Sequence, residues 1–525
     1  MSENSRMTKA AGIVSAATFI SRIFGLLRDL VFAWFFGAGI YSDAFIAAFR
    51  IPNLLRRLFG EGSLSIAFVP VFSEYLANKG EDEAFKMARS AVRLLAIILF
   101  VAALCGIFAA PFIIRAIAPG FTESPEKFAI TVTLTRIMFP YTIFICMVAL
   151  CMGILNALGH FAAPALAPVL LNIAMISSMF IISFVSLDGA ARIKGLSVGV
   201  LAGGALQLCL QLPFLIKKRF YFWKKAALYH PGLKKIGTLM FSAVFGAAVY
   251  QINVLVGTLL ASLLPEGSVS YLYYADRLVQ FPLGIFGIAI ATAVLPSLSR
   301  QAAAKDFDSL RDTFAHAIKL VFFITIPSMT GLIILREPIV ELLFKRGAFD
   351  LEASRLTASA LLYYSAGLWA FSGVRIVVST FYALQDAKTP VRTAAISVIA
   401  NIILGIILMQ PLGHRGLALA TSLSSVLNLG LLVFFLRSKL GSFAWKGISI
   451  SAYKTLICSV FMGILVWGVS RMIIPCEAGT MTELFWGIFA GVLTGLIMYG
   501  LFSLLIKSTE LELAMSIIKK RVIKN

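Results

Sequence analysis

Charged side chains are scarce in this sequence. Of its 525 residues only 14% are Asp, Glu, Lys or Arg, whereas soluble domains carry about 25%. Hydrophobic residues make up 59%, and the mean hydropathy is +0.91. This balance excludes a soluble globular protein. Apolar stretches long enough to cross roughly 30 Å of hydrocarbon recur along the chain, so we predict that nearly all of it lies in a membrane.

Cysteine and histidine are also rare, with six and four residues. They show no CxxC motif and no Cys/His ligand spacing, which argues against a metal site, a cofactor or a disulfide framework. The sequence contains no nucleophile–base arrangement, no phosphate-cradling glycine loop and no ATPase motif. We therefore predict that the chain is not an enzyme, with no catalytic residues, no metal and no cofactor.

Acidic residues are outnumbered by basic ones, 25 against 46, for a formal net charge of +21. In a soluble protein this excess would indicate nucleic-acid binding. In a membrane protein it is explained by cytoplasmic loops that fix orientation and by a pathway for an anionic substrate. We predict no nucleic-acid partner.

The sequence predicts an all-α polytopic membrane protein with about fourteen transmembrane helices. The N-terminus lacks the short apolar core and the cleavage site of a signal peptide, so we expect it to be uncleaved. The candidate spans lie near residues 10–37, 42–76, 86–118, 127–157, 163–187, 195–217, 234–264, 268–300, 309–336, 352–384, 390–411, 415–438, 452–475 and 482–506.

Basic loops predict the orientation of these spans. Seven lysines and arginines lie within residues 217–235, after the sixth span, while the connection at 37–42 has none. The basic stretches after the twelfth span and at the C-terminus agree, whereas Lys345 and Arg346 after the ninth span oppose the rule. Since cytoplasmic loops are enriched in Lys and Arg, we expect both termini to be cytoplasmic.

The chain also repeats itself. Pairs of similar segments recur at one constant offset, among them Ser90-Ala-Val-Arg-Leu-Leu95 with His316-Ala-Ile-Lys-Leu-Val321; further on, Lys194-Gly195-Leu196 recurs as Arg415-Gly416-Leu417. Because the offset covers six spans, an even number, the copies share one orientation. We predict two parallel six-helix bundles with the substrate site between them. The predicted domains are an N-terminal lobe (1–217), a basic cytoplasmic linker (218–233), a C-terminal lobe (234–438), and two further helices with a basic tail (439–525).

Several charges fall inside the predicted spans, where an ion costs roughly 2.5–3.5 kcal/mol on insertion scales and so needs a partner, water or a function. In the second span, four of them lie within roughly 40° of one another around the helix axis, although Pro52 interrupts the helix; they are Asp43, Arg50, Arg57 and Glu61. The charged residues of the first, second and eighth spans are Arg22, Arg28, Asp29, Asp43, Arg50, Arg56, Arg57, Glu61, Asp276 and Arg277.

Two interpretations of these charges compete. The arginines pair with the carboxylates and only hold helices together, or they line a path for a substrate. Six arginines face four carboxylates, which leaves a net positive lining. Because the guanidinium fork suits phosphate and pyrophosphate, an anionic headgroup is the favoured occupant.

At these residues the chain resembles the MurJ (MviN) family, the lipid II flippases of the multidrug/oligosaccharidyl-lipid/polysaccharide exporter superfamily. The resemblance covers essentially the full length. It is carried by Ser21-Arg-Ile-Phe-Gly-Leu-Leu-Arg-Asp29, Ser42-Asp-Ala-Phe45, Ile51-Pro-Asn-Leu-Leu-Arg-Arg57, Gly60-Glu-Gly62, Phe68-Val-Pro70 and Tyr274-Ala-Asp-Arg277.

The resemblance implies a multi-pass protein of the bacterial inner membrane that serves peptidoglycan synthesis and cell shape. It implies that lipid II, a polyprenyl pyrophosphate bearing a disaccharide-peptide, enters from the cytoplasmic leaflet and leaves outward by alternating access. Its partners would be lipid II, membrane lipids and other cell-wall synthesis proteins. Together with the charge argument, it assigns substrate binding to Ser21, Arg22, Arg28, Asp29, Asp43, Asn53, Arg56, Arg57, Glu61, Asp276 and Arg277.

Two departures from the family pattern stand out. Some members have a glutamate one turn after the eighth-span arginine, where this chain has Gln280. Sodium-binding members use carboxylates in the seventh and eleventh spans, and neither span contains Asp or Glu here. Sodium coupling is therefore in doubt.

Other functions fit the residues less well. A flippase for another polyprenyl-pyrophosphate glycan, such as an O-antigen unit, would use the same arginine lining and is separated only by the motifs. A drug or cation antiporter would prefer an acidic cavity. A glycosyl or acyl transferase would need a catalytic constellation, and a structural scaffold would not need unbalanced buried charge.

Overall fold

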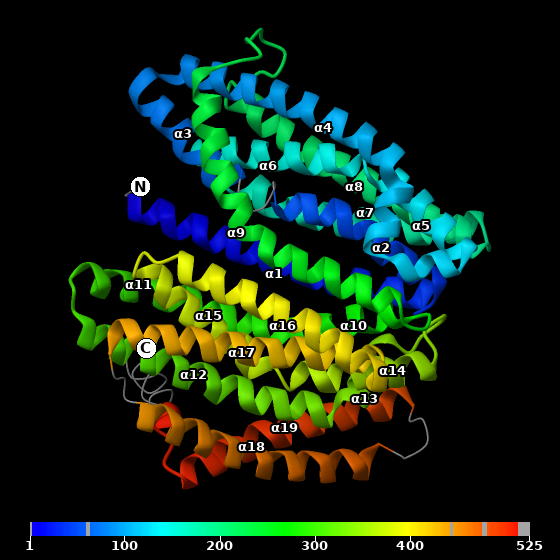
Figure 1. Cartoon of the computed structure of the whole chain (residues 1–525), viewed down its shortest axis with the longest axis vertical. Helices are drawn as coiled ribbons and strands as arrows, with labels where there is room; N and C mark the ends of the chain where they lie inside the picture. Colours follow the sequence, from blue (N-terminus) through cyan, green and yellow to red (C-terminus); the bar gives the residue numbers. More distant parts are fainter. Residues whose placement is uncertain (1–2, 59–63, 442–444, 475–479, 513–525) are drawn as a thin grey trace. The chain divides into compact units, whose positions relative to one another are not determined.

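The computed structural model describes residues 3–58, 64–441, 445–474 and 480–512. Within these ranges the regular structure is helical, without strands (Figure 1). Ten described helices or helix pairs are long and apolar enough to cross a membrane, and one bent pair would raise the number to eleven. The predicted all-α polytopic fold is confirmed, while the number of fourteen spans stays a prediction.

The chain divides into two compact units, and the first comprises Met1–Ser270 with Arg346–Phe349. Within it, α7 packs along α8 and α1 packs along α7. Its helices are α1 (Glu3–Phe36), α2 (Ile40–Leu55), α3 (Leu64–Lys79), α4 (Glu81–Ile117), η2 (Pro119–Glu123), α5 (Pro125–Met138), α6 (Tyr141–Ala157), α7 (Ala162–Val185), α8 (Gly189–Lys217) and α9 (Pro231–Ser262).

The second unit comprises Tyr271–Lys345 and Asp350–Asn525. Helix pairs α16·α17 and α18·α19 pack closely along their lengths (Figure 1). Its helices are α10 (Ser268–Pro282, whose first turn belongs to the first unit), η3 (Leu283–Gly287), α11 (Ile288–Ala303), α12 (Phe307–Ile334), α13 (Arg336–Phe344), α14 (Leu351–Ser365), α15 (Leu368–Ala383), α16 (Lys388–Leu412), α17 (His414–Leu440), α18 (Trp445–Ile473) and α19 (Met481–Leu505).

These units group the chain differently from the predicted lobes, because α9 follows the predicted linker 218–233 and yet belongs to the first unit. Each unit has its own apolar core. In the first, Phe68, Phe72 and Phe85 stack between α3 and α4. The core of the second is built mainly from α11, α12, α15 and α17. The lobe boundaries stay a prediction.

Helix boundaries recur at the offset found in the sequence. Helix α4 begins at Glu81 and α12 at Phe307, while α6 ends at Ala157 and α15 at Ala383, so both pairs have the same separation along the chain as the repeated sequence segments. The turns after these ends also match, because Gly159 and Gln385 both adopt positive φ, 75° and 58°. The two copies therefore share local structure as well as sequence.

The repeated Gly195 and Gly416 have a packing explanation. A Cβ on Gly195 would lie 2.7 Å from Cγ1 of Ile182, and one on Gly416 only 2.1 Å from the carbonyl oxygen of Leu408. Each glycine thus lies where its helix approaches the preceding one too closely for a side chain. Close approach of this kind is typical of membrane helix pairs.

Candidate functional site

The first group of predicted residues lies on α1, where Asp29 and Asn172 hold Arg28. Its Nε and Nη2 donate to Oδ1 of Asp29 at 3.0 and 2.7 Å, and its Nη1 donates to Oδ1 of Asn172 on α7 at 3.1 Å. The amide of Asn172 in turn donates to the carbonyl of Ser21 at 3.4 Å. Three bonds therefore fix the orientation of the Arg28 guanidinium.

Burial explains why this cluster forms. Asp29 is only 3% exposed, and a buried carboxylate needs a cation or several donors. Arg22, on the same helix, is exposed. Helix α1 thus presents Arg22 and holds Arg28 against α7.

Asp43 forms a second cluster near the start of α2. Its side chain is 1% exposed and forms an ion pair with Nζ of Lys127, at 2.7 Å from Oδ2. It also accepts the backbone amides of Gly267 and Ser270, both at 2.9 Å, and the hydroxyl of Ser270 at 2.6 Å. Four donors satisfy one carboxylate.

The Asp43 cluster ties three stretches of the first unit together: the start of α2, the start of α5 and residues 267–270. Lys127 is 7% exposed, and its ammonium also lies 4.3 Å from the centre of the Phe121 ring. Such a saturated carboxylate positions helices. It offers little acceptor capacity to anything else.

The third group lies at the end of α2. Oδ1 of Asn53 accepts Nε and Nη2 of Arg56 at 3.0 and 2.8 Å. Arg50 and Arg57 are half-buried. Glu61 lies outside the described residues. The structure thus describes the predicted polar stripe on this span only as far as Arg57. Asp43, at the start of the stripe, is ion-paired with Lys127.

The remaining predicted residues lie on α10, in the second unit. Nη2 of Arg277 donates to the hydroxyl of Tyr273 at 3.1 Å, and its guanidinium carbon lies 5.1 Å from the centre of the same ring. Asp276 accepts Nε2 of Gln280 at 2.6 Å. Gln280 therefore bonds a carboxylate, which a glutamate at this position could not do while ionised.

Sequence reasoning missed five partners of these residues, which are Lys127, Asn172, Gly267, Ser270 and Tyr273. Asn172 had a detectable signal, because a lone amide in an apolar span usually bonds another helix. Lys127 follows Pro125 at a helix start and looks like an ordinary interfacial charge. Among the described residues, no three of His, Cys, Asp and Glu gather to hold a metal ion.

Comparison with known proteins identifies the family. The family model described as "Lipid II flippase MurJ" matches residues 32–507. The chain belongs to the lipid II flippase MurJ family. The family resemblance found in the sequence motifs is thereby confirmed, and the chain is a multi-span membrane protein of a transporter family.

Individual relatives agree with this assignment. A "Probable lipid II flippase MurJ" of Vibrio cholerae is 40% identical over 510 residues, 95% of each chain. A "Lipid II flippase MurJ" of Burkholderia cenocepacia is 37% identical over 430 residues, 81% of this chain and 83% of the relative.

Solved structures match as well. "Lipid II flippase MurJ, inward closed conformation" aligns with a TM-score of 0.79 and 30% identity, covering 93% of this chain and 98% of that one. An inward-facing multidrug resistance MATE family transporter of the MOP superfamily aligns with a TM-score of 0.68 at 14% identity, covering 82% of this chain and 98% of that one. This second likeness shows the fold alone.

Proposed function

We propose that this chain moves lipid II from the cytoplasmic to the outer leaflet of the bacterial inner membrane by alternating access. The observation that carries the proposal is the 40% identity over 95% of both chains with a relative named a probable lipid II flippase. The basic residues of the first two spans support it, because a pyrophosphate lipid needs cations along its path.

In this proposal Arg22, Arg28, Arg56, Arg57 and Arg277 contact the pyrophosphate. Arginine donates two parallel hydrogen bonds to phosphate oxygens, and its charge persists inside a membrane. The other predicted residues position these arginines or the helices that carry them. They are Ser21, Asp29, Asp43, Asn53, Asp276 and, on the motif alone, Glu61.

The contacts of Arg28 support this division of roles. Two hydrogen bonds to Asp29 and one to Asn172 hold its guanidinium, so little side-chain entropy is lost when an anion binds. Its side chain is 12% exposed, which leaves part of the group accessible.

A depletion experiment tests the function. In a bacterium whose own lipid II flippase is depleted, we expect expression of this chain to restore growth and normal shape, because lipid II would again reach the outer leaflet. The measurement is colony formation, together with the amount of lipid II accessible on the outer surface of spheroplasts. A strain lacking its O-antigen flippase serves as the control, and restoration of that strain alone would contradict the proposal.

We also propose that both termini and residues 218–233 are cytoplasmic, as the basic loops indicate. Leu187 and Trp223 are 86% and 67% exposed and follow successive spans, so they should lie on opposite sides. In a variant without its native cysteines, Leu187→Cys should react with an impermeant maleimide in intact spheroplasts, and Trp223→Cys only after lysis. The reverse pattern would overturn the orientation.

A further inference from the structure

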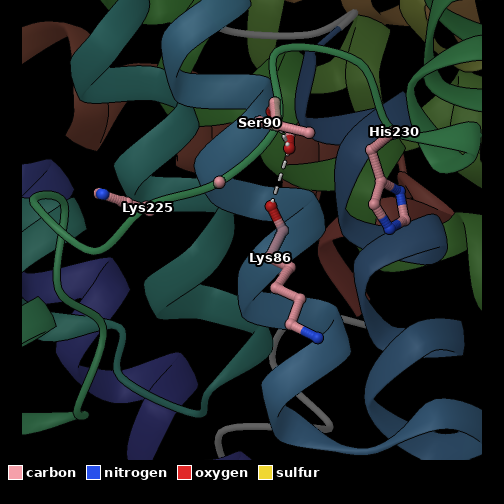
Figure 2. Close-up of a pocket in the computed structure, with 6 residues that line it drawn as sticks. Lys86, Ser90, Lys225 and His230 are labelled. Atoms are coloured by element: carbon pink, nitrogen blue, oxygen red, sulfur yellow. Dashed lines mark hydrogen bonds between the residues drawn. The ribbon is translucent and has the colours of Figure 1, made fainter.

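A pocket of about 320 Å³ lies in the first unit, apart from the charged residues of α1 and α2, where α4 meets the connection between α8 and α9 (Figure 2). Helix α4 and the connecting segment each supply part of its wall. The lining residues are Lys86, Ser90, Lys225, Ala226, Ala227 and His230.

Hydrogen bonds fix the connecting segment onto α4. The hydroxyl of Ser90 donates to the carbonyl of Ala227 at 2.6 Å. Arg93, two turns after Lys86, donates from Nη2 to the carbonyl of Lys224 at 3.2 Å and from Nη1 to that of Ala226. Because three backbone carbonyls of this short segment accept hydrogen bonds from α4, the segment is fixed in place as one wall of the pocket.

The imidazole of His230 is oriented as well. Its Nδ1 accepts the amide of Gly232 at 3.1 Å, so the ring proton lies on Nε2. That Nε2 faces Oε1 of Glu83 at 3.3 Å, while Nζ of Lys86 bonds Oε2 of the same carboxylate at 3.1 Å. The side chains of His230 and Lys86 therefore bond the same carboxylate, that of Glu83.

Positive charge dominates the walls of this pocket. At about 100° per residue, Lys86, Arg89 and Arg93 share one face of α4. Arg89 is only 7% exposed, and its Nε has no hydrogen-bond partner among the described residues. The lining itself contains two lysines, Lys86 and Lys225, and no carboxylate.

The surroundings of the pocket indicate a membrane surface. Helix α4 has 37 residues and is about 55 Å long, so its ends extend beyond a hydrocarbon core of roughly 30 Å. Lys86 and Ser90 lie in its first three turns. On the connecting segment, Trp223 and Tyr229 are 67% and 68% exposed. Exposed Trp and Tyr beside lysines are typical of the interface between headgroups and water.

We propose that this pocket binds the phosphate of an anionic phospholipid headgroup, with the ammonium groups of Lys86 and Lys225 as its main contacts. Basic pockets at membrane surfaces recognise such headgroups, and lysine binds phosphate as a point charge without a fixed fork geometry. The side chains of Lys86 and Lys225 point away from each other in Figure 2, so both turn toward the phosphate when it binds: Lys86 leaves Glu83, and Nε2–H of His230 remains on the carboxylate. The site is separate from the proposed transport path.

Binding is tested on the full chain purified in a mild detergent. Dihexanoyl phosphatidylglycerol, titrated below its micelle concentration, should raise the melting temperature of the wild-type protein, because a ligand that binds only the folded state stabilises it. Dihexanoyl phosphatidylcholine, whose net charge is zero, should not. For Lys86→Gln/Lys225→Gln we expect an apparent affinity for phosphatidylglycerol that is roughly thirtyfold weaker.

The matched control is Lys217→Gln/Lys218→Gln, which removes the same charge from exposed positions of the first unit outside the pocket lining. It should respond to phosphatidylglycerol like the wild type, and both variants should melt like the wild type without lipid. An equal loss of affinity in both variants would overturn the proposal. So would an equal response of the wild type to inorganic phosphate, which would assign the pocket to a soluble anion.

Discussion

Arg22→Ala is expected to abolish the restored growth of the flippase-depleted strain without lowering the melting temperature of the protein. Arg22 is exposed on α1, so its removal creates no cavity and strands no buried partner. A hydrogen bond to a charged group contributes about 1.5–3 kcal/mol, and loss of a bidentate contact should slow lipid II transport at least about tenfold. Lipid II exposure in spheroplasts measures transport, and fluorescence-detected unfolding measures stability.

Arg28 should behave differently, because it also hydrogen-bonds the buried carboxylate of Asp29. Arg28→Ala removes the guanidinium that donates two hydrogen bonds to the carboxylate of Asp29, 3% exposed, so it should lower the melting temperature as well as transport. Arg28→Lys keeps the charge and loses the fork, and should recover stability better than transport. Arg300→Ala, on an exposed arginine of α11, is the matched control and should retain both. Normal transport in both Arg22→Ala and Arg28→Ala would contradict the assigned site.

The internal repeat made much of the fold predictable. The constant offset between repeated sequence segments anticipates the equal spacing of the starts of α4 and α12. The number of spans was harder to predict, because apolar composition does not reveal bends. The predicted span 352–384 coincides with α14 and α15, which are bent by 43° against each other, and a helix of 16 residues covers only about 24 Å.

The candidate site was predictable in its residue types and less so in its contacts. Unbalanced arginines in apolar spans are visible in any sequence, and Arg22 and Arg28 were found in this way. Their partners depend on tertiary packing. Asn172 lies 144 residues from Arg28, and Lys127 lies 84 residues from Asp43, and no periodicity connects such pairs. The basic residues after α8 were interpreted only as an orientation signal, although two of them line or flank a built pocket.

Asp43 offers the second large effect, because it separates a positioning role from direct substrate binding. Asp43→Ala should strongly lower the melting temperature, since it leaves the Lys127 ammonium, 7% exposed, without its carboxylate. Breaking a buried ion pair by removing one partner costs about 3–5 kcal/mol, and the amides of Gly267 and Ser270 also lose their acceptor.

A double-mutant cycle identifies the interaction that is lost. Asp43→Asn loses the charge and keeps one acceptor oxygen, which serves only one of the two amides, so its melting temperature should lie between those of Asp43→Ala and the wild type. Adding Lys127→Met removes the stranded ammonium, and Asp43→Asn/Lys127→Met should therefore be more stable than Asp43→Asn alone. Its melting temperature is measured in detergent, and its transport by lipid II exposure. If Asp43→Ala abolishes transport while melting like the wild type, the carboxylate acts on the substrate, and holding α2, α5 and residues 267–270 together is not its main role.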